Sequence, residues 1–359
     1  MFVEMRVLHS YCLNYNIGDY ALGIGVKNLL RNFLPIDFIG ETNLQGRYFN
    51  EYYISQVVNK KYDLLVVGGG GIIHGSHWPN GWFWLIDKDL IQSIKIPFII
   101  YGVGDNYFQD ERIPDRAIDH IKETFRHALS FSVRNDGSLE RVINDIGIHP
   151  EEVPDPGFYV GLNTEYSRPI NDKYVIIQVA NDKAGHRFGS DLNRKQFVLA
   201  MKKIARYLSS SYKVLFAPHV YDDVALSKEI MGGIENCYMW DFGYLAFDHS
   251  DKAVGYYKYA EFVLSMRGHG QILPISFGVP TIALCNHPKH KGLMEKLSLS
   301  DWAVTIDDPR FGELVIEKIE ALKKENSSFQ ERLHLLNAKM LDNTTRFFDE
   351  LNLKLARNG

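Results

Sequence analysis

The sequence lacks the features that mark secreted and membrane-spanning proteins. It has three cysteines in 359 residues, Cys12, Cys237 and Cys285, an odd and widely spaced set that suits a reduced protein rather than a disulfide scaffold. No apolar run approaches the roughly 18 residues that cross a bilayer. The N-terminus, MFVEMRVLHSYC, does not have the pattern of a signal peptide. We therefore expect a soluble protein of the cytoplasm.

Clustered positive charge is also missing. The 40 Lys and Arg residues are outnumbered by 44 Asp and Glu residues, and they are scattered along the chain. No footprint for nucleic acid is therefore visible, and we expect no such partner. Hydrophobic residues make up 45% and charged residues 23% of the chain, which is typical of folded proteins and excludes extensive disorder.

Short apolar segments alternate with segments of helical periodicity, which is typical of parallel sheets covered by helices. The predicted strands lie at 5–10, 63–67, 97–103, 129–133, around Val153, and at 173–180, 213–219, 261–266, 280–285 and 303–306. A polar segment at 161–172 interrupts this alternation and is the best candidate linker. We therefore predict an α/β domain at 1–165, a second at 172–306, and C-terminal helices at 307–359.

Helical periodicity also predicts the positions of the main helices. They lie at 20–33, 114–127, 195–208 and, in the tail, at 311–324 and 329–355. Ser328 and Glu331 have the spacing of a capping box at the start of the last helix. The tail is therefore expected to consist of two helices.

In an open parallel sheet, ligands bind beyond the carboxyl ends of the strands. The residues that follow the predicted strands are Asn16 to Asp19, Gly68 to Gly71 with His74, Gly102 to Asn106, Arg134 to Asp136, Pro218 with His219, Arg267 to Gly270, and Asn286 to Lys289. They are rich in Asn, Gly, Asp, His, Arg and Lys. We therefore expect a polar site at these strand ends.

The four glycines at 68–71 permit close approach of backbone N–H groups to a ligand or to a facing element. Close packing of a helix on the sheet explains the same run equally well. The segment GGGGIIHG matches neither the G-x-G-x-x-G fingerprint nor a P-loop. The run alone does not predict a nucleotide site.

The segment Arg267-Gly268-His269-Gly270 lies between a predicted strand and the apolar helical run 271–277, so it occupies a helix N-terminus. Backbone N–H groups and the helix dipole favour an anion there, and Arg267 adds a bidentate partner for phosphate or carboxylate. His269 can transfer a proton near neutral pH. A buried structural histidine is the alternative, but the flanking glycines and the arginine favour a functional site.

Lys289 and Arg134 also follow predicted strands. Three cations at strand ends in a chain of net charge −4 predict a compact anionic ligand, although each alone is typical of solvated surface. The pairs His74-x-x-His77 and His287-x-x-His290 come without a Cys or a carboxylate at a familiar metal spacing, so no metal is expected. The G-x-S-x-G elbow of serine hydrolases is also missing.

Several motifs together resemble those of the polysaccharide pyruvyltransferase family. They are the N-x-G-D segment at 16–19, LLVVGGGGII, the S-x-R segment ending at Arg134, Asp155-Pro156, and the block SMRGHGQILPISFGVPTIALCNHPKHKGLMEKL at 265–297. In this family an aspartate usually follows the S-x-R arginine directly, whereas here Asn135 intervenes before Asp136.

The resemblance implies an α/β fold of two Rossmann-like domains facing each other across a cleft, similar to GT-B glycosyltransferases, with a C-terminal helical tail. The N-terminal domain would be the acceptor side and the C-terminal domain the donor side. Phosphoenolpyruvate would be the donor, with no further cofactor, and a sugar of a glycan or of a lipid-linked precursor at the membrane periphery would be the acceptor. The product would be a pyruvate ketal, with release of phosphate.

The resemblance also assigns donor binding and catalysis to four positions in this sequence, Arg134, Arg267, His269 and Lys289, with Gly268 beside them. Cations suit the carboxylate and phosphate of phosphoenolpyruvate. We expect His269 to protonate the methylene carbon of this donor, because a histidine near its ordinary pKa can supply a proton at neutral pH.

The remaining candidate residues belong to the acceptor side. Asp19 and His74 are the candidate bases for the attacking sugar hydroxyls, and Asn16, Gly69 and Gly70 are expected to line the cleft. Trp78, in the run WPNGWFW, is the first candidate for stacking on a sugar ring, although such a run also suits a packed loop.

Two other functions fit the same architecture. A GT-B-like glycosyltransferase with a nucleotide-sugar donor would prefer an acidic residue near position 289 to hold a ribose hydroxyl, where this chain has lysine. A catalytically inactive glycan-binding protein would bind oligosaccharide without turnover, and the presence of both Arg267 and His269 argues against it.

Overall fold

The structure is a computed structural model that describes residues 4–107, 111–247, 250–286 and 288–358, with the side chains at 250, 288 and 289 outside this description. Residue contacts divide the chain into two compact units. Unit 1 comprises the N-terminal segment to Asn14, Leu22–Asn163 and the segment from Met340 onward. Unit 2 comprises Tyr15–Ala21 and Thr164–Lys339.

Among the described residues, unit 1 is built on a six-stranded parallel sheet in the order β2-β1-β3-β4-β5-β6. Its strands are β1 (Met5–Tyr11), β2 (Ile36–Asn43), β3 (Leu64–Ile73), β4 (Phe98–Asp105), β5 (Ser130–Arg134) and β6 (Glu151–Val153). The helices in this part of the chain are α1 (Ile17–Phe33), α2 (Glu51–Tyr53), α3 (Asn59–Lys61), α4 (Asp115–His127) and α5 (Ser138–Arg141).

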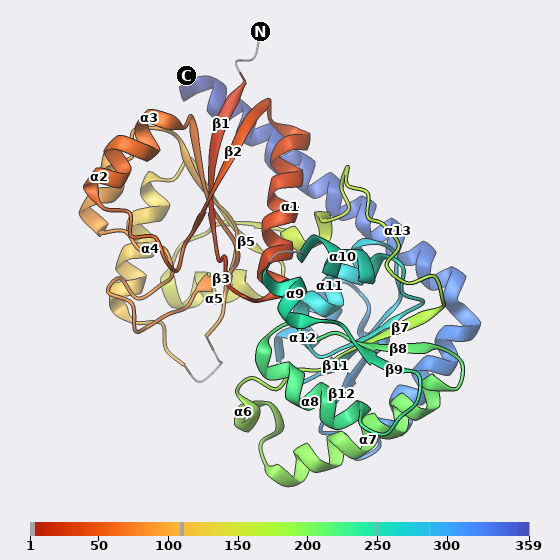
Figure 1. Cartoon of the computed structure of the whole chain (residues 1–359). Helices are drawn as coiled ribbons and strands as arrows, with labels where there is room; N and C mark the ends of the chain where they lie inside the picture. The colour runs from red at the N-terminus through yellow and green to blue at the C-terminus, as the bar shows by residue number, and fades with distance from the viewer. Residues whose placement is uncertain (1–3, 108–110, 248–249, 287, 359) are drawn as a thin grey trace. The chain divides into compact units, whose positions relative to one another are not determined.

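The winding of this sheet reverses after β2. The chain moves from β1 to β2 on one side and then crosses back to β3, β4, β5 and β6 on the other. Because parallel crossovers are right-handed, the reversal places α1 on one face of the sheet and α4 on the other (Figure 1). The C-terminal part of α13 (Phe311–Asn358) packs on the α1 face, where the Phe33 and Phe348 rings stack with centroids 4.8 Å apart.

The glycine run lies inside β3 rather than after it, so the predicted end of this strand at residue 67 is wrong. Gly68 and Gly70 still pair with β4, and Gly68, Gly69 and Gly70 have φ angles of +133°, +80° and +113°. A Cβ at Gly69 would lie 3.2 Å from Val26 of α1. The glycines therefore serve a strand conformation that other residues avoid and the close packing of α1 on the sheet.

In the part of the chain that the structure describes, unit 2 also contains a six-stranded parallel sheet, in the order β12-β11-β10-β7-β8-β9. Its strands are β7 (Tyr174–Gln178), β8 (Lys213–Phe216), β9 (Cys237–Met239), β10 (Val263–Ser265), β11 (Thr281–Cys285) and β12 (Ala303–Thr305). The helices are α6 (Ala184–Phe188), α7 (Asp191–Ser209), α8 (Tyr221–Met231), α9 (Phe242–Phe247), α10 (Ser250–Lys258), α11 (Gly268–Ser276), α12 (Pro288–Lys296) and the first part of α13.

The second sheet reverses its winding between β9 and β10. The chain builds β7, β8 and β9 in one direction and then crosses to β10, β11 and β12 on the other side of β7. Right-handed crossovers then put α7 and α8 on one face and α10 and α11 on the other (Figure 1). The topological switch point, where ligands bind in such sheets, lies between the carboxyl ends of β7 and β10.

The α/β prediction is confirmed, with two corrections. The edge strands β2 and β9 were not predicted, because their exposed, partly polar residues hide the strand pattern. The tail is a single helix, α13, rather than two, and the predicted capping box is wrong. Ser328 lies within this helix and its hydroxyl donates to the carbonyl of Glu325. None of the described helices is long and apolar enough to cross a membrane.

A substitution at Gly25 tests the close contact between α1 and the segment after β6. A Cβ at this buried position would overlap the carbonyl of Pro156. We expect Gly25→Ala to lower the free energy of unfolding by about 1–3 kcal/mol, because overpacking outweighs the better helix propensity of alanine. Chemical denaturation at neutral pH measures the change.

Gly292 provides the matched control in α12, because a Cβ there would meet no described atom within 4 Å. We expect Gly292→Ala to be neutral or to stabilise the protein by up to about 1 kcal/mol. Equal effects of the two substitutions would contradict the packing argument.

His9 makes the stability of unit 1 sensitive to pH. Its side chain is completely buried in β1, and one ring nitrogen lies 3.0 Å from the carbonyl oxygen of Gly68. Burial lowers the pKa of His9 to about 4. Below about pH 6.5, His9 of the unfolded chain binds a proton that His9 of the folded chain does not bind. Falling pH therefore favours unfolding.

We expect the His9 contribution to the free energy of unfolding to fall by about 2 kcal/mol from about pH 7 to about pH 5. A His9→Gln variant should therefore show a flatter pH dependence than the parent in denaturant titrations. His149→Gln, at an exposed position, is the control and should keep the parent slope. If His9→Gln keeps the pH dependence of the parent protein, His9 is not the source of this pH dependence.

Candidate functional site

Buried polar side chains form a hydrogen-bond network at the switch point of unit 2. Gln178, the last residue of β7, accepts hydrogen bonds from the backbone N–H of Arg267 (2.8 Å) and from the hydroxyl of Ser265 (3.0 Å). Both Gln178 and Ser265 are completely buried. These hydrogen bonds join the carboxyl ends of β7 and β10 beside the backbone of Arg267.

The guanidinium of Arg267 is held by a bidentate ion pair with Asp223. Its Nε donates to Asp223 Oδ2 at 2.8 Å and its Nη2 donates to Asp223 Oδ1 at 2.7 Å. Asp223 has no exposed surface, and the Arg267 side chain is 13% exposed. Burial lowers the pKa of Arg267, but the charges of Asp223 and Asp182 outweigh it and leave this pKa raised.

A second carboxylate and a second arginine complete this charged cluster. Asp182, beyond the end of β7, accepts from Nη2 of Arg267 and also pairs with Arg187 at 2.9 Å. The two arginines and the two carboxylates sum to zero charge. Arg267 Nη1 makes no hydrogen bond to a described residue, so it is the part of the guanidinium left for a ligand.

His219, beyond the end of β8, connects this cluster to the start of α1. Its backbone N–H donates to Asp223 Oδ2 (3.1 Å), and its carbonyl accepts from the N–H of Ile17 (3.1 Å). Burial, followed by the positive charges of Arg267 and His269, holds the pKa of His219 well below its usual range. The imidazole is therefore neutral near pH 7, with Nε2 2.6 Å from the hydroxyl of Tyr257.

The N-x-G-D segment lies against the R-x-H segment within unit 2. Asn16 caps α1, because its side-chain oxygen accepts from the N–H of Gly18 at 2.9 Å. A Cβ at Gly18 would overlap the imidazole of His269. Residue 18 is therefore glycine because the ring of His269 occupies the space, and Asp19 follows it in the half-buried first turn of α1.

Helix α11 begins where the sequence predicts. Its first intrahelical hydrogen bond runs from the N–H of Gln271 to the carbonyl of Arg267 (3.1 Å), so the preceding N–H groups point out of the helix end. A Cβ at Gly268 would meet no described atom within 4 Å. Packing therefore does not require glycine at 268, and the space beside this helix end is open.

Unit 1 holds Arg134 in a separate ion-pair network. Its Nε donates to Asp136 at 2.6 Å and its Nη1 donates to Asp155 at 3.2 Å. Asp155 also accepts from the N–H of Gly157 at 2.8 Å and begins the turn after β6. The displaced aspartate, Asp136, thus still binds its arginine, and the Asp155-Pro156 motif anchors it.

The other candidates in unit 1 have contacts of their own. Gly69 and Gly70 are buried in β3. His74 is half-buried and packs edge-on against Tyr107, with ring centroids 5.0 Å apart. Trp78 is half-buried and packs against His77, with ring centroids 4.8 Å apart. The side chain of Lys289 and the whole of His287 lie outside the described residues, and the described side chains include no group of three metal ligands.

A comparison with protein families assigns this chain. The model of the family Polysaccharide pyruvyl transferase matches residues 16–288, which include Asn16, Arg134, Arg267 and His269. The chain belongs to the polysaccharide pyruvyl transferase family. A comparison with curated proteins gives no significant match.

Solved structures share the fold of this pyruvyl transferase family member. A putative UDP-N-acetylglucosamine 2-epimerase from Listeria monocytogenes aligns with a TM-score of 0.57 and 12% identity, over 97% of this chain and 98% of that one. The glycosyltransferase SnogD from Streptomyces nogalater gives 0.52 and 10%, over 98% and 99%. The UDP-GlcNAc 2-epimerase from Neisseria meningitidis bound to UDP-GlcNAc gives 0.53 and 14%, over 98% and 100%. These likenesses show the GT-B-like fold of two Rossmann-like units.

Sequence reasoning missed the carboxylates of this candidate site. Asp182 lies just beyond the end of β7, so applying the strand-end rule there would have found it. Asp223 lies in the first turn of α8, where an acidic residue reads as a helix cap. Its pairing with Arg267 depends on contacts between loops that the sequence does not reveal.

Removal of the Asp223 charge tests the buried network. In Asp223→Asn the guanidinium of Arg267 loses its bidentate partner while the site keeps its shape. We expect a loss of about 3–5 kcal/mol in the free energy of unfolding, because breaking a buried ion pair leaves an uncompensated charge. Denaturant titration at neutral pH measures this loss.

The neighbouring Asp222→Asn substitution is the control. Asp222 occupies the same helix turn but is exposed. Its replacement should cost at most about 1 kcal/mol, from the helix dipole alone. A similarly small loss in Asp223→Asn would refute the role of the pair.

Proposed function

We propose that this protein transfers the pyruvyl group of phosphoenolpyruvate to a sugar of a glycan or of a lipid-linked glycan precursor. The product is a pyruvate ketal that bridges two hydroxyl groups, and inorganic phosphate is released. The observation that carries the proposal is the position of His269. It lies in the first turn of α11 at the switch point of unit 2, next to Arg267 and inside the segment matched by the family model.

In the proposed reaction His269 acts first, as the general acid. Its proton adds to the methylene carbon of phosphoenolpyruvate, which leaves oxocarbenium character on the adjacent carbon. One sugar hydroxyl attacks that carbon and gives its proton to a base. The second hydroxyl then displaces phosphate and closes the ketal, and its proton leaves with the phosphate. Asp19, in the first turn of α1, and His74 remain the proposed bases.

The paired arginines change the proposed way of binding the donor. Arg267 is neutralised by Asp223 and Asp182, and Arg134 by Asp136 and Asp155, so neither offers an uncompensated charge. We infer that they direct N–H groups at the donor rather than attract it from a distance. Attraction of the trianion then falls to the N-terminus of α11, where Gly268 leaves space, and to Lys289.

The proposal includes the location and the remaining partners. The described structure joins none of the three cysteines in a disulfide, which agrees with a reducing compartment such as the cytoplasm. A lipid-linked acceptor would bring the protein to a membrane surface. Phosphoenolpyruvate is a co-substrate here, and the reaction as written is balanced without a further cofactor.

The role of His269 is tested by His269→Gln, which keeps a polar side chain of similar size without an acid. We expect phosphate release from phosphoenolpyruvate, in the presence of a panel of aryl glycosides, to fall about a hundredfold or more. Mass spectrometry should show the loss of the pyruvate-ketal product. An unaltered circular dichroism spectrum and melting temperature would show that the fold is intact.

His149→Gln is the control for this experiment, because His149 is exposed in unit 1. It should retain the parent rate. Unchanged phosphate release in His269→Gln would disprove the general-acid role. Thermal stabilisation of the parent protein by nucleotide sugars and not by phosphoenolpyruvate would instead favour a glycosyltransferase.

A further inference from the structure

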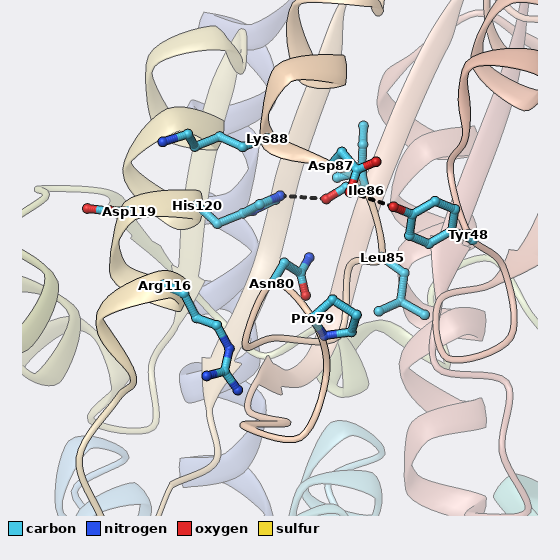
Figure 2. Close-up of a pocket in the computed structure, with 10 residues that line it drawn as sticks. All are labelled: Tyr48, Pro79, Asn80, Leu85, Ile86, Asp87, Lys88, Arg116, Asp119 and His120. Atoms are coloured by element: carbon cyan, nitrogen blue, oxygen red, sulfur yellow. Dashed lines mark hydrogen bonds between the residues drawn. The ribbon is translucent and has the colours of Figure 1, made fainter.

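Unit 1 contains a pocket of about 270 Å³ that none of the candidate residues above lines. Three segments form it: Tyr48 after β2, the segment 79–88 after β3, and the first half of α4 (Figure 2). Its volume lies just below the range that is usual for ligand pockets, which begins at about 300 Å³. The pocket therefore suits a ligand of one ring rather than a nucleotide.

His120 forms one wall of the pocket, and its hydrogen bonds fix its protonation state. The indole N–H of Trp82 donates to Nδ1 of His120 at 2.8 Å, and an indole nitrogen can only donate. Nδ1 is therefore unprotonated, and Nε2 donates to the carbonyl of Ile86 at 2.8 Å. Burial lowers the pKa of His120, which agrees with a neutral ring. This side of the pocket carries no charge near neutral pH.

The aromatic run WPNGWFW lies beside the pocket and fixes the shape of the pocket. Trp82 and Trp84 are completely buried in the core of unit 1, so their rings do not face a ligand. Asn80, which lines the pocket, bonds to the N–H of Trp82 (3.3 Å) and to the carbonyl of Trp84. These bonds fix the conformation of residues 80–84, which makes this wall of the pocket preformed.

Tyr48 gives the pocket an accessible aromatic wall. Its side chain is 41% exposed, and its hydroxyl donates to Asp87 Oδ1 at 2.5 Å (Figure 2). The hydrogen bond to Asp87 raises the pKa of Tyr48 to about 12, so the hydroxyl stays protonated. A fixed aromatic face next to a polar group is well suited to a ring that has apolar C–H faces and polar edges.

The charged residues of the pocket balance one another. Lys88 and Arg116 contribute two positive charges, and Asp87 and Asp119 contribute two negative charges, all at exposed positions. A phosphate would face both carboxylates, and a cation would face both basic groups. Hydroxyl groups can donate to the carboxylates and accept from the basic groups, so the pocket favours an uncharged polyhydroxylated ligand.

We propose that this pocket binds one uncharged pyranose ring of a glycan. The proposal takes the class of ligand, a glycan, from the proposed function, but it does not depend on the transfer reaction. Tyr48 supplies the stacking face, and Asp87, Asp119, Lys88 and Arg116 supply partners for the ring hydroxyls. None of the residues that line this pocket has a role in the proposed transfer reaction.

The test measures binding to the full chain in the absence of phosphoenolpyruvate. Methyl pyranosides of glucose, galactose, mannose and N-acetylglucosamine are titrated by saturation-transfer NMR and calorimetry. We expect at least one to bind, and Tyr48→Ala to raise its dissociation constant tenfold or more. Tyr52→Ala is the matched control, because Tyr52 is 72% exposed in α2 and does not line the pocket.

A second variant keeps the test decisive if Tyr48→Ala does not fold. Asp119 is exposed on α4, and Asp119→Ala should also weaken binding of the methyl pyranoside. The proposal is overturned if none of the four pyranosides binds, or if binding survives both substitutions. Tighter binding of glucose 6-phosphate than of methyl glucoside, lost in Arg116→Gln, would also overturn it, because the ligand would then be anionic.

Phosphate release from phosphoenolpyruvate, measured on the same samples, separates this proposal from the proposed function. Pyranoside binding that depends on Tyr48, without any pyruvyl transfer, would support the pocket and defeat the transferase. Pyruvyl transfer without pyranoside binding would support the transferase and overturn the pocket proposal.

Discussion

The contact between Asp223 and Arg267 determines how the carboxyl edge of the second sheet is built. A carboxylate with no exposed surface is tolerated only when hydrogen-bond donors surround it. Asp223 accepts from Arg267 and from the backbone N–H groups of His219 (3.1 Å) and Asn181 (3.0 Å). These donors follow β10, β8 and β7, so one side chain sets the positions of three loops at the switch point.

The same pairing defines the electrostatics of the site. Two arginines that the sequence suggests as a positive clamp, Arg267 and Arg134, are each held by two carboxylates. These carboxylates cancel the long-range field of each arginine and fix the directions of its N–H groups. In each unit the carboxylates therefore set the electrostatics around the arginine as much as the arginine itself does.

The residues themselves show which features the sequence could predict. Central strands such as β3 and β7 are buried on both faces and read as continuous apolar runs, and the start of α11 is marked by the glycines around His269. Edge strands β2 and β9 have no such pattern. The break expected near Ser328 does not occur, and the neighbouring Phe329 packs on Trp302 with ring centroids 4.5 Å apart, a tertiary contact that the sequence does not reveal. Ion pairs between loops depend on tertiary contacts and had no local signal.

The contact of Gly18 with the ring of His269 joins two segments that lie 251 positions apart in the sequence. Residues 15–21 belong to the second unit by their contacts, although the following residues of α1 belong to the first. A fragment that starts at residue 164 would therefore leave one side of the imidazole uncovered. A peptide carrying residues 15–21 would have to be added back to restore the surroundings of this histidine.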